Sequence, residues 1–131
     1  MLGRGHSVWL VEDEIAMARY LGQLLDTHGC RACLFNDPAC ALAAFRATPD
    51  EPDLPITDHT MPVMSGLQLA QQLHGPRPGL PIFLCSGHAG EQVPAAVQRS
   101  AIRQFFAKPL AADLLLAALQ EQLAPARCAR Q

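Results

Sequence analysis

Residues 7–14 read SVWLVEDE, a largely apolar run of five residues that is followed at once by three acids. The run is continuous rather than alternating, which is typical of a strand covered on both faces. Apolar residues then recur at helical spacing from Glu14 to His28, and Gly29 supplies a helix stop. The stretch therefore predicts a strand that ends in carboxylates and is followed by a helix.

The same order of strand and helix continues along the chain. The patterns predict further strands at 30–35, 54–57, 81–85 and 104–107, and helices at 38–47, 66–74, 91–100 and 111–123, with a loose tail from Pro125. Strands that alternate with helices form right-handed crossovers. We therefore predict an α/β fold: a doubly wound, five-stranded parallel sheet with helices on both faces.

Pro55 conflicts with this pattern, because it lies inside a predicted central strand. Proline lacks the N–H that a ladder needs and is usually found at strand starts, edges or bulges. We expect the third strand to begin late, at Ile56, or to carry a local irregularity.

Length and composition indicate one domain over residues 1–131, with a core at about 7–123. The chain has a formal net charge of −2 and no block of basic residues, which disfavours nucleic-acid binding. No apolar run approaches the roughly 20 residues that span a bilayer, so no membrane segment is expected. We expect a cytoplasmic protein.

The five cysteines are an odd number, which suits a reducing compartment where thiols act as small core residues. Cys30 and Cys33 have CxxC spacing, but they lie in a predicted strand, where residues three apart point to opposite faces. A shared zinc site is therefore not expected.

The chemistry is expected where the strands end, because the carboxyl ends of parallel strands meet at one edge of a sheet and ligands bind there. Clustered carboxylates repel by about 1 to 4 kcal/mol per pair at around 4 Å. A hard divalent cation relieves this repulsion, and oxygen ligands favour Mg²⁺ over zinc. The side chains at this edge are Glu12, Asp13, Asp58, Ser86 and Lys108.

Two charged residues near this edge, Glu14 and Lys108, are expected to have different roles. Glu14 is expected to enter the first helical turn, where an acid complements the helix dipole. Lys108 is the single lysine beside nine arginines. A lysine is a compact charge on a flexible stem, which suits a phosphoryl group beside a carboxylate better than the planar fork of arginine.

Four motifs in order resemble the receiver domain of two-component response regulators: VEDE at 11–14, TDHTMP at 57–62 with Gly66, LCSG at 84–87 and FFAKP at 105–109. The resemblance covers about residues 7–123 and implies a flavodoxin-like fold of receiver type. The amino-acid sequences from Asp58 to Gly66 and from Leu80 to His88 look most like those of receivers fused to hybrid histidine kinases. The chain is therefore either a stand-alone regulator or one piece of a hybrid kinase.

This resemblance also implies roles for individual residues. Asp58 is the acceptor of a phosphoryl group from a phosphohistidine. Asp13 and Asp58 bind Mg²⁺ together with the backbone carbonyl of Thr60, and Glu12 acts through bound water. Ser86 and Lys108 contact the phosphoryl oxygens, which fits a transfer that depends on positioning and charge cancellation.

The resemblance further implies a switch and a control of its lifetime. Ser86 follows the phosphoryl group and Phe105 then turns inward, although Phe105 is alternatively a permanent core or interface residue. Thr60 and His88 flank the path of attacking water, although His88 is alternatively a plain loop residue. The partner is a histidine kinase or phosphotransfer domain, or the chain's own kinase in a hybrid. No enzyme is implied beyond self-catalysed phosphoryl transfer and autodephosphorylation.

Three other classes of protein are alternatives to a receiver domain. A haloacid-dehalogenase-like phosphatase needs a second aspartate two residues after the nucleophile, where this chain has Thr60. A pseudo-receiver, which is an interaction module without phosphorylation, usually lacks part of the acid set. A flavodoxin-like nucleotide carrier needs a hydroxyl- and glycine-rich loop after the first strand, where this chain has acids.

Overall fold

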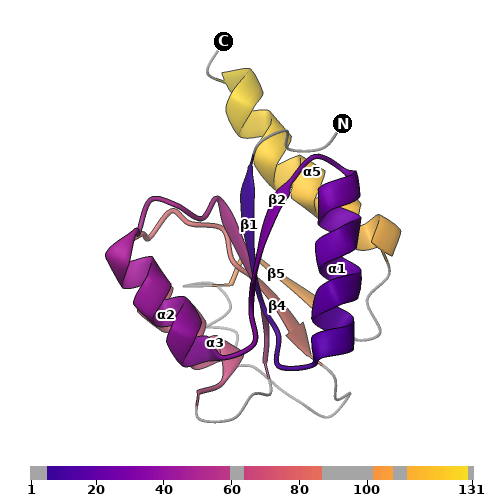
Figure 1. The fold of residues 1–131 in the computed structure, drawn as a ribbon. Helices are drawn as coiled ribbons and strands as arrows, with labels where there is room; N and C mark the ends of the chain where they lie inside the picture. The colour runs from indigo at the N-terminus through magenta and orange to yellow at the C-terminus, as the bar shows by residue number, and fades with distance from the viewer. Residues whose placement is uncertain (1–5, 60–63, 87–101, 108–111, 130–131) are drawn as a thin grey trace.

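The computed structural model describes residues 6–59, 64–86, 102–107 and 112–129. Strands and helices alternate from residue 7 to residue 86, and one more strand and one more helix follow within the described residues (Figure 1). The elements are β1 (Ser7–Val11), α1 (Ile15–Thr27), β2 (Arg31–Phe35), α2 (Pro38–Ala47), β3 (Leu54–Asp58), α3 (Gly66–His74), β4 (Phe83–Ser86), β5 (Gln104–Ala107) and α5 (Ala112–Ala129). The helix predicted at 91–100 lies outside the described residues.

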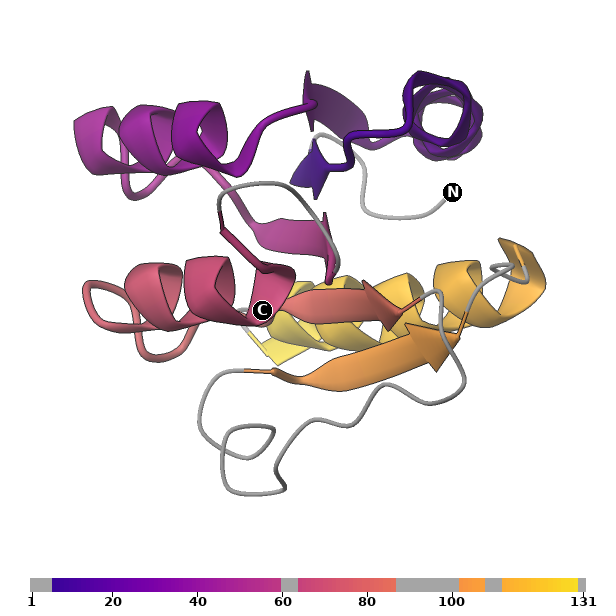
Figure 2. The same cartoon turned by 90° about the horizontal axis from the view of Figure 1, so that it is seen from below.

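The sheet has five strands in the order β2-β1-β3-β4-β5, and every pairing is parallel. Helices α1 and α5 cover one face of the sheet, and α2 and α3 cover the other (Figure 2). The predicted fold class, a doubly wound α/β sheet, is confirmed. None of the described helices is long and apolar enough to cross a membrane.

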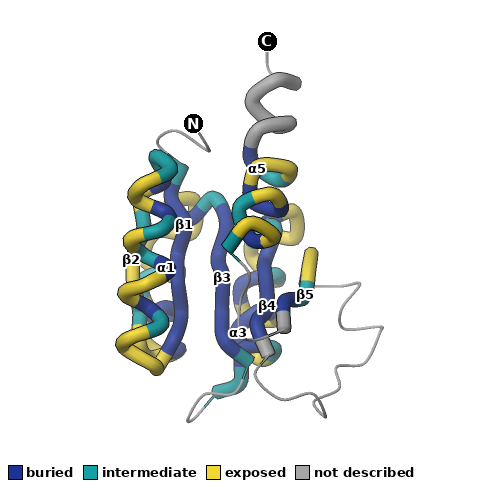
Figure 3. Tube along the Cα trace, turned by 90° about the vertical axis from the view of Figure 1, so that its right-hand side faces the viewer, coloured by how far each residue is buried: buried dark blue, intermediate teal, exposed yellow. Residues whose placement is uncertain are grey.

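Each face of the sheet has its own hydrophobic core. Leu10 and Phe83 pack toward α1 and α5, whereas Trp9 and Leu84 pack toward α2 and α3. Successive residues of a strand point to opposite faces, so the continuous apolar runs of β1 and β3 fill both cores. All five residues of each of these two strands are buried, as Figure 3 shows.

Local signals set the ends of the helices. Gly29 ends α1 with a φ of 87°, a left-handed conformation that favours glycine. The Asp37 side chain caps α2 by accepting from the Ala39 N–H at 2.9 Å, and Pro38 takes the first helical position. Ser65 and Gln68 form a reciprocal capping box at the start of α3.

The expected irregularity at Pro55 is wrong. Strand β3 begins at Leu54, and its register with β1 runs without interruption through Trp9–Pro55. The register with β4 begins only at Ile56–Phe83. The His59 N–H donates to Cys85 O, and alternation along the strand turns the Pro55 nitrogen toward this same side. The missing donor therefore faces the β4 side just before that ladder begins.

The expected end of the last helix near Leu123 is also wrong, because α5 continues through Pro125 to Ala129. A proline removes one backbone donor, and residues after it that favour helix, such as Ala126 and Arg127, continue the turn.

The cysteine predictions are confirmed in part. Cys30 belongs to the core under α1 and α5, whereas Cys33 packs against the opposite core, so the two thiols do not share a site. Cys85 is buried, but Cys40 is exposed on α2 rather than being a core residue.

Candidate functional site

Three carboxylates meet at the carboxyl end of the sheet. Glu12 and Asp13 follow β1, and Asp58 is the last residue of β3. One oxygen from each side chain lies within 4.8 Å of the others. Because β1 and β3 are adjacent parallel strands, their ends bring together acids that are 45 residues apart in the sequence. The predicted acid cluster is therefore present.

The Glu12 side chain is held inward by the turn that leads into α1. Its backbone N–H donates to Phe35 O at 2.9 Å, which extends the ladder one residue past β1. Its carboxylate accepts the Glu14 N–H at 3.2 Å, and the side chain is buried. Asp13 is exposed beside it, so the cluster opens to solvent on the Asp13 side.

Glu14 is not part of this cluster. It is the exposed N-cap residue of α1, and its side chain makes no capping hydrogen bond. Glu14 is thus separate from the site, as expected, but it precedes the first helical turn instead of entering it, and that turn contains no acid.

Asp58 is buried at the end of β3, and hydrogen bonds hold the backbone around it. It is only 6% exposed, and its backbone pairs with Cys85 of β4. The buried Thr57 hydroxyl donates to Asp58 O at 3.0 Å, and the next residue, His59, donates its N–H to Cys85 O at 2.8 Å. These bonds fix the backbone on both sides of the Asp58 side chain.

Gly66 lets α3 begin directly against this backbone. Its N–H donates to His59 O at 2.8 Å. A Cβ at position 66 would lie 2.1 Å from Asp58 O and 2.7 Å from a methyl carbon of Leu84. No side chain fits there, so glycine is required for the geometry around Asp58. The sequence motif contains Gly66, but only the structure reveals this contact.

The cluster has the donor set that suits a hard divalent cation. At about 4.8 Å, each carboxylate pair repels by roughly 1 to 3.5 kcal/mol between the limits for water and for a protein surface. Its donors are all oxygens, and two of its three side chains are buried, so the repulsion is concentrated in a confined space. Mg²⁺ is bound by one or two carboxylates with the remaining positions taken by water, and this arrangement fits it.

The remaining predicted residues are placed only in part. Ser86 is the last residue of β4, which puts its backbone at the same edge of the sheet as Asp58. Phe105 lies in β5, is partly buried and packs against the core under α2 and α3. Thr60, His88 and Lys108 lie outside the described residues.

Comparisons with known proteins agree with the geometry. The family model described as response regulator receiver domain matches residues 8–120. The C4-dicarboxylate transport transcriptional regulatory protein DctD of Rhizobium meliloti is 35% identical over 84% of the chain, and the protein of the same name from Pseudomonas aeruginosa is 32% identical over 88%. A receiver domain protein from Clostridium thermocellum superposes with a TM-score of 0.86 at 19% identity, covering 94% of this chain and 98% of that one.

The two DctD proteins are much longer than this chain. The matched regions amount to 24% and 25% of the two DctD proteins. The chain thus spans about a quarter of the length of these two relatives, and the similarity concerns that part of them alone.

Proposed function

Since the chain belongs to the family of response regulator receiver domains of two-component systems, we propose that Asp58 is its phosphoacceptor and that residues 1–131 act as a single phosphorylation-controlled switch. The observation that carries this proposal is the buried Asp58 carboxylate, which lies within 4.8 Å of Glu12 and Asp13 at the end of the sheet. The donor is a histidine kinase or a phosphotransfer domain.

The transfer is a displacement at phosphorus. An Asp58 carboxylate oxygen forms a bond to the phosphorus, and the P–N bond of the phosphohistidine breaks as the imidazole leaves with its electron pair. The bond from the Thr57 hydroxyl to Asp58 O and the bond from the His59 N–H to Cys85 O hold the Asp58 backbone in a fixed position during this step. Such positioning favours in-line attack without any further covalent chemistry from the protein.

Glu12, Asp13 and Asp58 would hold Mg²⁺, with Thr60 O as a further proposed ligand. The bound ion supplies charge neutralisation for the acids and the phosphoryl oxygens. Ser86 and Lys108 are proposed to contact the phosphoryl group, and Phe105 to change its packing in response. Thr60 and His88 are proposed to tune the lifetime of the phosphorylated state, which the domain ends by autodephosphorylation.

The test is phosphorylation by a small donor. The protein is incubated with Mg²⁺ and acetyl phosphate, and its intact mass is measured. We expect a gain of about 80 Da, the mass of one phosphoryl group, which is absent when Mg²⁺ is chelated. The matched control is Asp53→Asn, which removes an acid at the other end of β3. An unmodified wild-type protein, or steady hydrolysis of unrelated phosphoesters, would contradict the proposal.

A further inference from the structure

The β2 edge of the sheet differs from the buried strands beside it. Strand β2 ends the strand order, so among the described residues only its β1 side is paired. Arg31 and Leu34 are exposed and the other three residues are partly buried, whereas all of β1 is buried (Figure 3). Leu34 is 47% exposed, which is unusual for a leucine in a strand.

The backbone groups that point outward from this edge can be identified. The Arg31 N–H donates to His6 O at 2.7 Å, and Phe35 O accepts the Glu12 N–H at 2.9 Å. Alternation along a parallel strand therefore turns Arg31, Cys33 and Phe35 toward β1. Ala32 and Leu34 direct their N–H and C=O groups to the open edge, where a further strand could pair with them.

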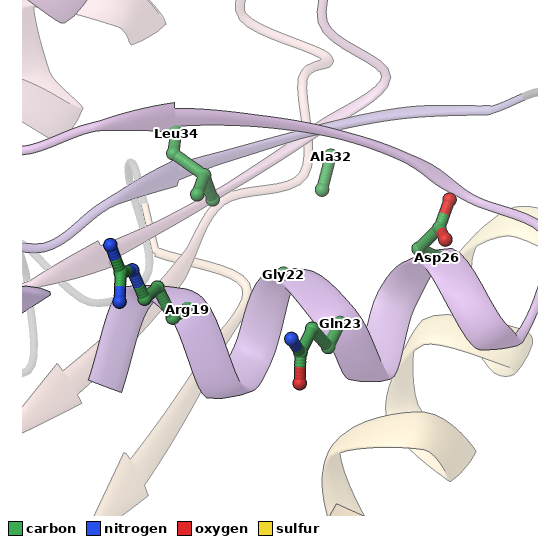
Figure 4. A pocket seen from close by; sticks show the side chains of 6 residues that line it. All are labelled: Arg19, Gly22, Gln23, Asp26, Ala32 and Leu34. Atoms are coloured by element: carbon green, nitrogen blue, oxygen red, sulfur yellow. The ribbon is translucent and has the colours of Figure 1, made fainter. Parts of the chain in front are cut away.

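A groove of about 420 Å³ runs beside this edge, between α1 and β2. Its floor is small and apolar, with Gly22 on α1 and Ala32 on β2, while Leu34 forms a raised end (Figure 4). Space at Gly22 is limited, because a Cβ there would lie 3.2 Å from a methyl carbon of Leu34. The small Ala32 side chain leaves a hollow at its end of the groove, and the larger, 47% exposed Leu34 forms a knob at the other end.

The two ends of the groove carry opposite charges. Arg19 lies near Leu34, with which it also lines a second hollow of about 150 Å³, and Asp26 lies toward the Ala32 end (Figure 4). Both side chains are exposed, and within the described part of the chain neither forms an ion pair. The groove is thus positively charged at the Leu34 end and negatively charged at the Ala32 end.

We propose that this edge binds a second copy of the same chain, with the two β2 strands antiparallel about a two-fold axis through Cys33. In this arrangement Leu34 packs over the partner's Ala32, and Ala32 receives the partner's Leu34. Ala32 and Leu34 direct their N–H and C=O groups toward the partner strand, so each Ala32–Leu34 pair forms two hydrogen bonds. A two-fold interface requires a surface that complements itself. The knob at Leu34 and the hollow at Ala32 meet this requirement.

The charges complement each other about the same axis. Helix α1 lies antiparallel to β2, and the midpoint between Arg19 and Asp26 falls at Gly22 and Gln23, level with the stretch of β2 between Ala32 and Leu34. The two-fold rotation places Arg19 opposite the partner's Asp26, and Asp26 opposite the partner's Arg19. Because one rotation matches backbone, shape and charge, a second copy explains the surface better than an unrelated protein.

Charge reversal provides the first test, measured by sedimentation velocity over a range of protein concentrations without any phosphodonor. Arg19→Asp and Asp26→Arg each create two like-charged contacts and are expected to weaken dimerisation by about tenfold. The double variant Arg19→Asp/Asp26→Arg restores the opposite charges and is expected to restore dimerisation. Far-ultraviolet circular dichroism checks that each variant is folded. A monomeric wild-type protein, or a double variant no better than the single ones, would overturn the proposal.

A thiol cross-link provides the second test, because the axis passes through Cys33. Opposed residues in a non-hydrogen-bonded antiparallel pair have Cα atoms about 4.5 Å apart, within the range of a disulfide. Copper phenanthroline accepts the two electrons as the two thiols lose their protons and form the S–S bond. The background is Cys40→Ser/Cys128→Ser, and a covalent dimer is expected that disappears on adding Cys33→Ser. A cross-link that persists without Cys33, or no cross-link at all, would contradict this axis. Because no phosphodonor is used, neither result depends on Asp58.

Discussion

Two aspartates flank strand β3, and their surroundings differ. Asp53 precedes the strand, accepts the Ser7 N–H at 2.7 Å and donates its own N–H to Ser7 O at 2.8 Å. Asp58 ends the strand, where its carboxylate lies among two other carboxylates. An acid bonded to a backbone donor of a neighbouring strand stabilises the fold, whereas acids held close to one another favour a cation. The carboxyl end of β3 therefore carries the candidate site, whereas its amino end carries a structural contact.

The largest expected effect comes from exchanging the two acids for amides. Asp58→Asn is expected to abolish the phosphoryl adduct completely, because an amide oxygen is a poor nucleophile and the acceptor carboxylate is gone. Asp53→Asn is expected to leave the adduct intact. Intact-mass measurement after incubation with Mg²⁺ and acetyl phosphate compares the two. An adduct of equal yield in Asp58→Asn would show that the two acids have been assigned wrongly.

The backbone behind Asp58 gives the next largest effect. Gly66→Ala would place a Cβ 2.1 Å from Asp58 O, so α3 must move and the free energy of unfolding is expected to fall by about 3 kcal/mol. Urea denaturation measures this change. Gly75→Ala is the control, since no heavy atom lies within 4 Å of a Cβ there. Equal stability of the two variants would mean that the contact at Asp58 is absent in solution.

Replacing Asp53 directly tests whether its bond to Ser7 stabilises the fold. Asp53→Ala leaves the Ser7 N–H without its 2.7 Å acceptor and is expected to lower the free energy of unfolding by about 2 kcal/mol. The loss should be the same with and without Mg²⁺, since Asp53 is far along the strand from the cluster. A loss that depends on Mg²⁺ would contradict the separation of roles.

Magnesium should stabilise the protein through the cluster alone. At ten times its dissociation constant, a ligand that binds only the folded state raises the free energy of unfolding by about 1.4 kcal/mol. We expect this gain for the wild-type protein and for Asp53→Asn, but not for Asp13→Asn/Asp58→Asn. Thermal unfolding with and without Mg²⁺ measures it. A gain that survives in the double variant would place the ion elsewhere.

The smallest expected effect concerns Cys30, beside the Asp53 end of the sheet. Burial, and then the charge of Asp53, raise the pKa of the Cys30 thiol above its ordinary value of 9.0. The unfolded chain ionises this thiol first as the pH rises, so the contribution of Cys30 is complete below about pH 9 and declines above it. Denaturation at rising alkaline pH should show a decline that is reduced in Cys30→Ala and unchanged in the exposed-site control Cys40→Ser. An equal decline in all three proteins would exclude Cys30 as its source.

The sequence predicts the sheet and the acid cluster well, because both follow from local patterns. Continuous apolar runs mark buried parallel strands, and the topology then brings Glu12 and Asp58 to one edge without any knowledge of side-chain contacts. The exclusion of a site at Cys30 and Cys33 rests on strand alternation in the same way. These predictions use only the period of the backbone, which the sequence displays directly.

Features that depend on distant contacts were beyond such reasoning. The effect of Pro55 depends on where β4 begins to pair, and the role of Asp53 depends on a bond to Ser7, 46 residues away. The need for glycine at position 66 follows from the position of Asp58 O. The groove beside β2 requires knowing that Gly22 faces Leu34, which no local pattern reveals.

The most direct test of the central claim is chemical mapping of the phosphorylated residue. Borohydride reduces an acyl phosphate to an alcohol, so a phosphorylated aspartate becomes homoserine, which peptide mass spectrometry locates. After incubation with Mg²⁺ and acetyl phosphate, we expect homoserine at position 58 and intact aspartate at positions 13 and 53. Homoserine at either of those positions, or at none, would contradict the assignment of Asp58 as the phosphoacceptor.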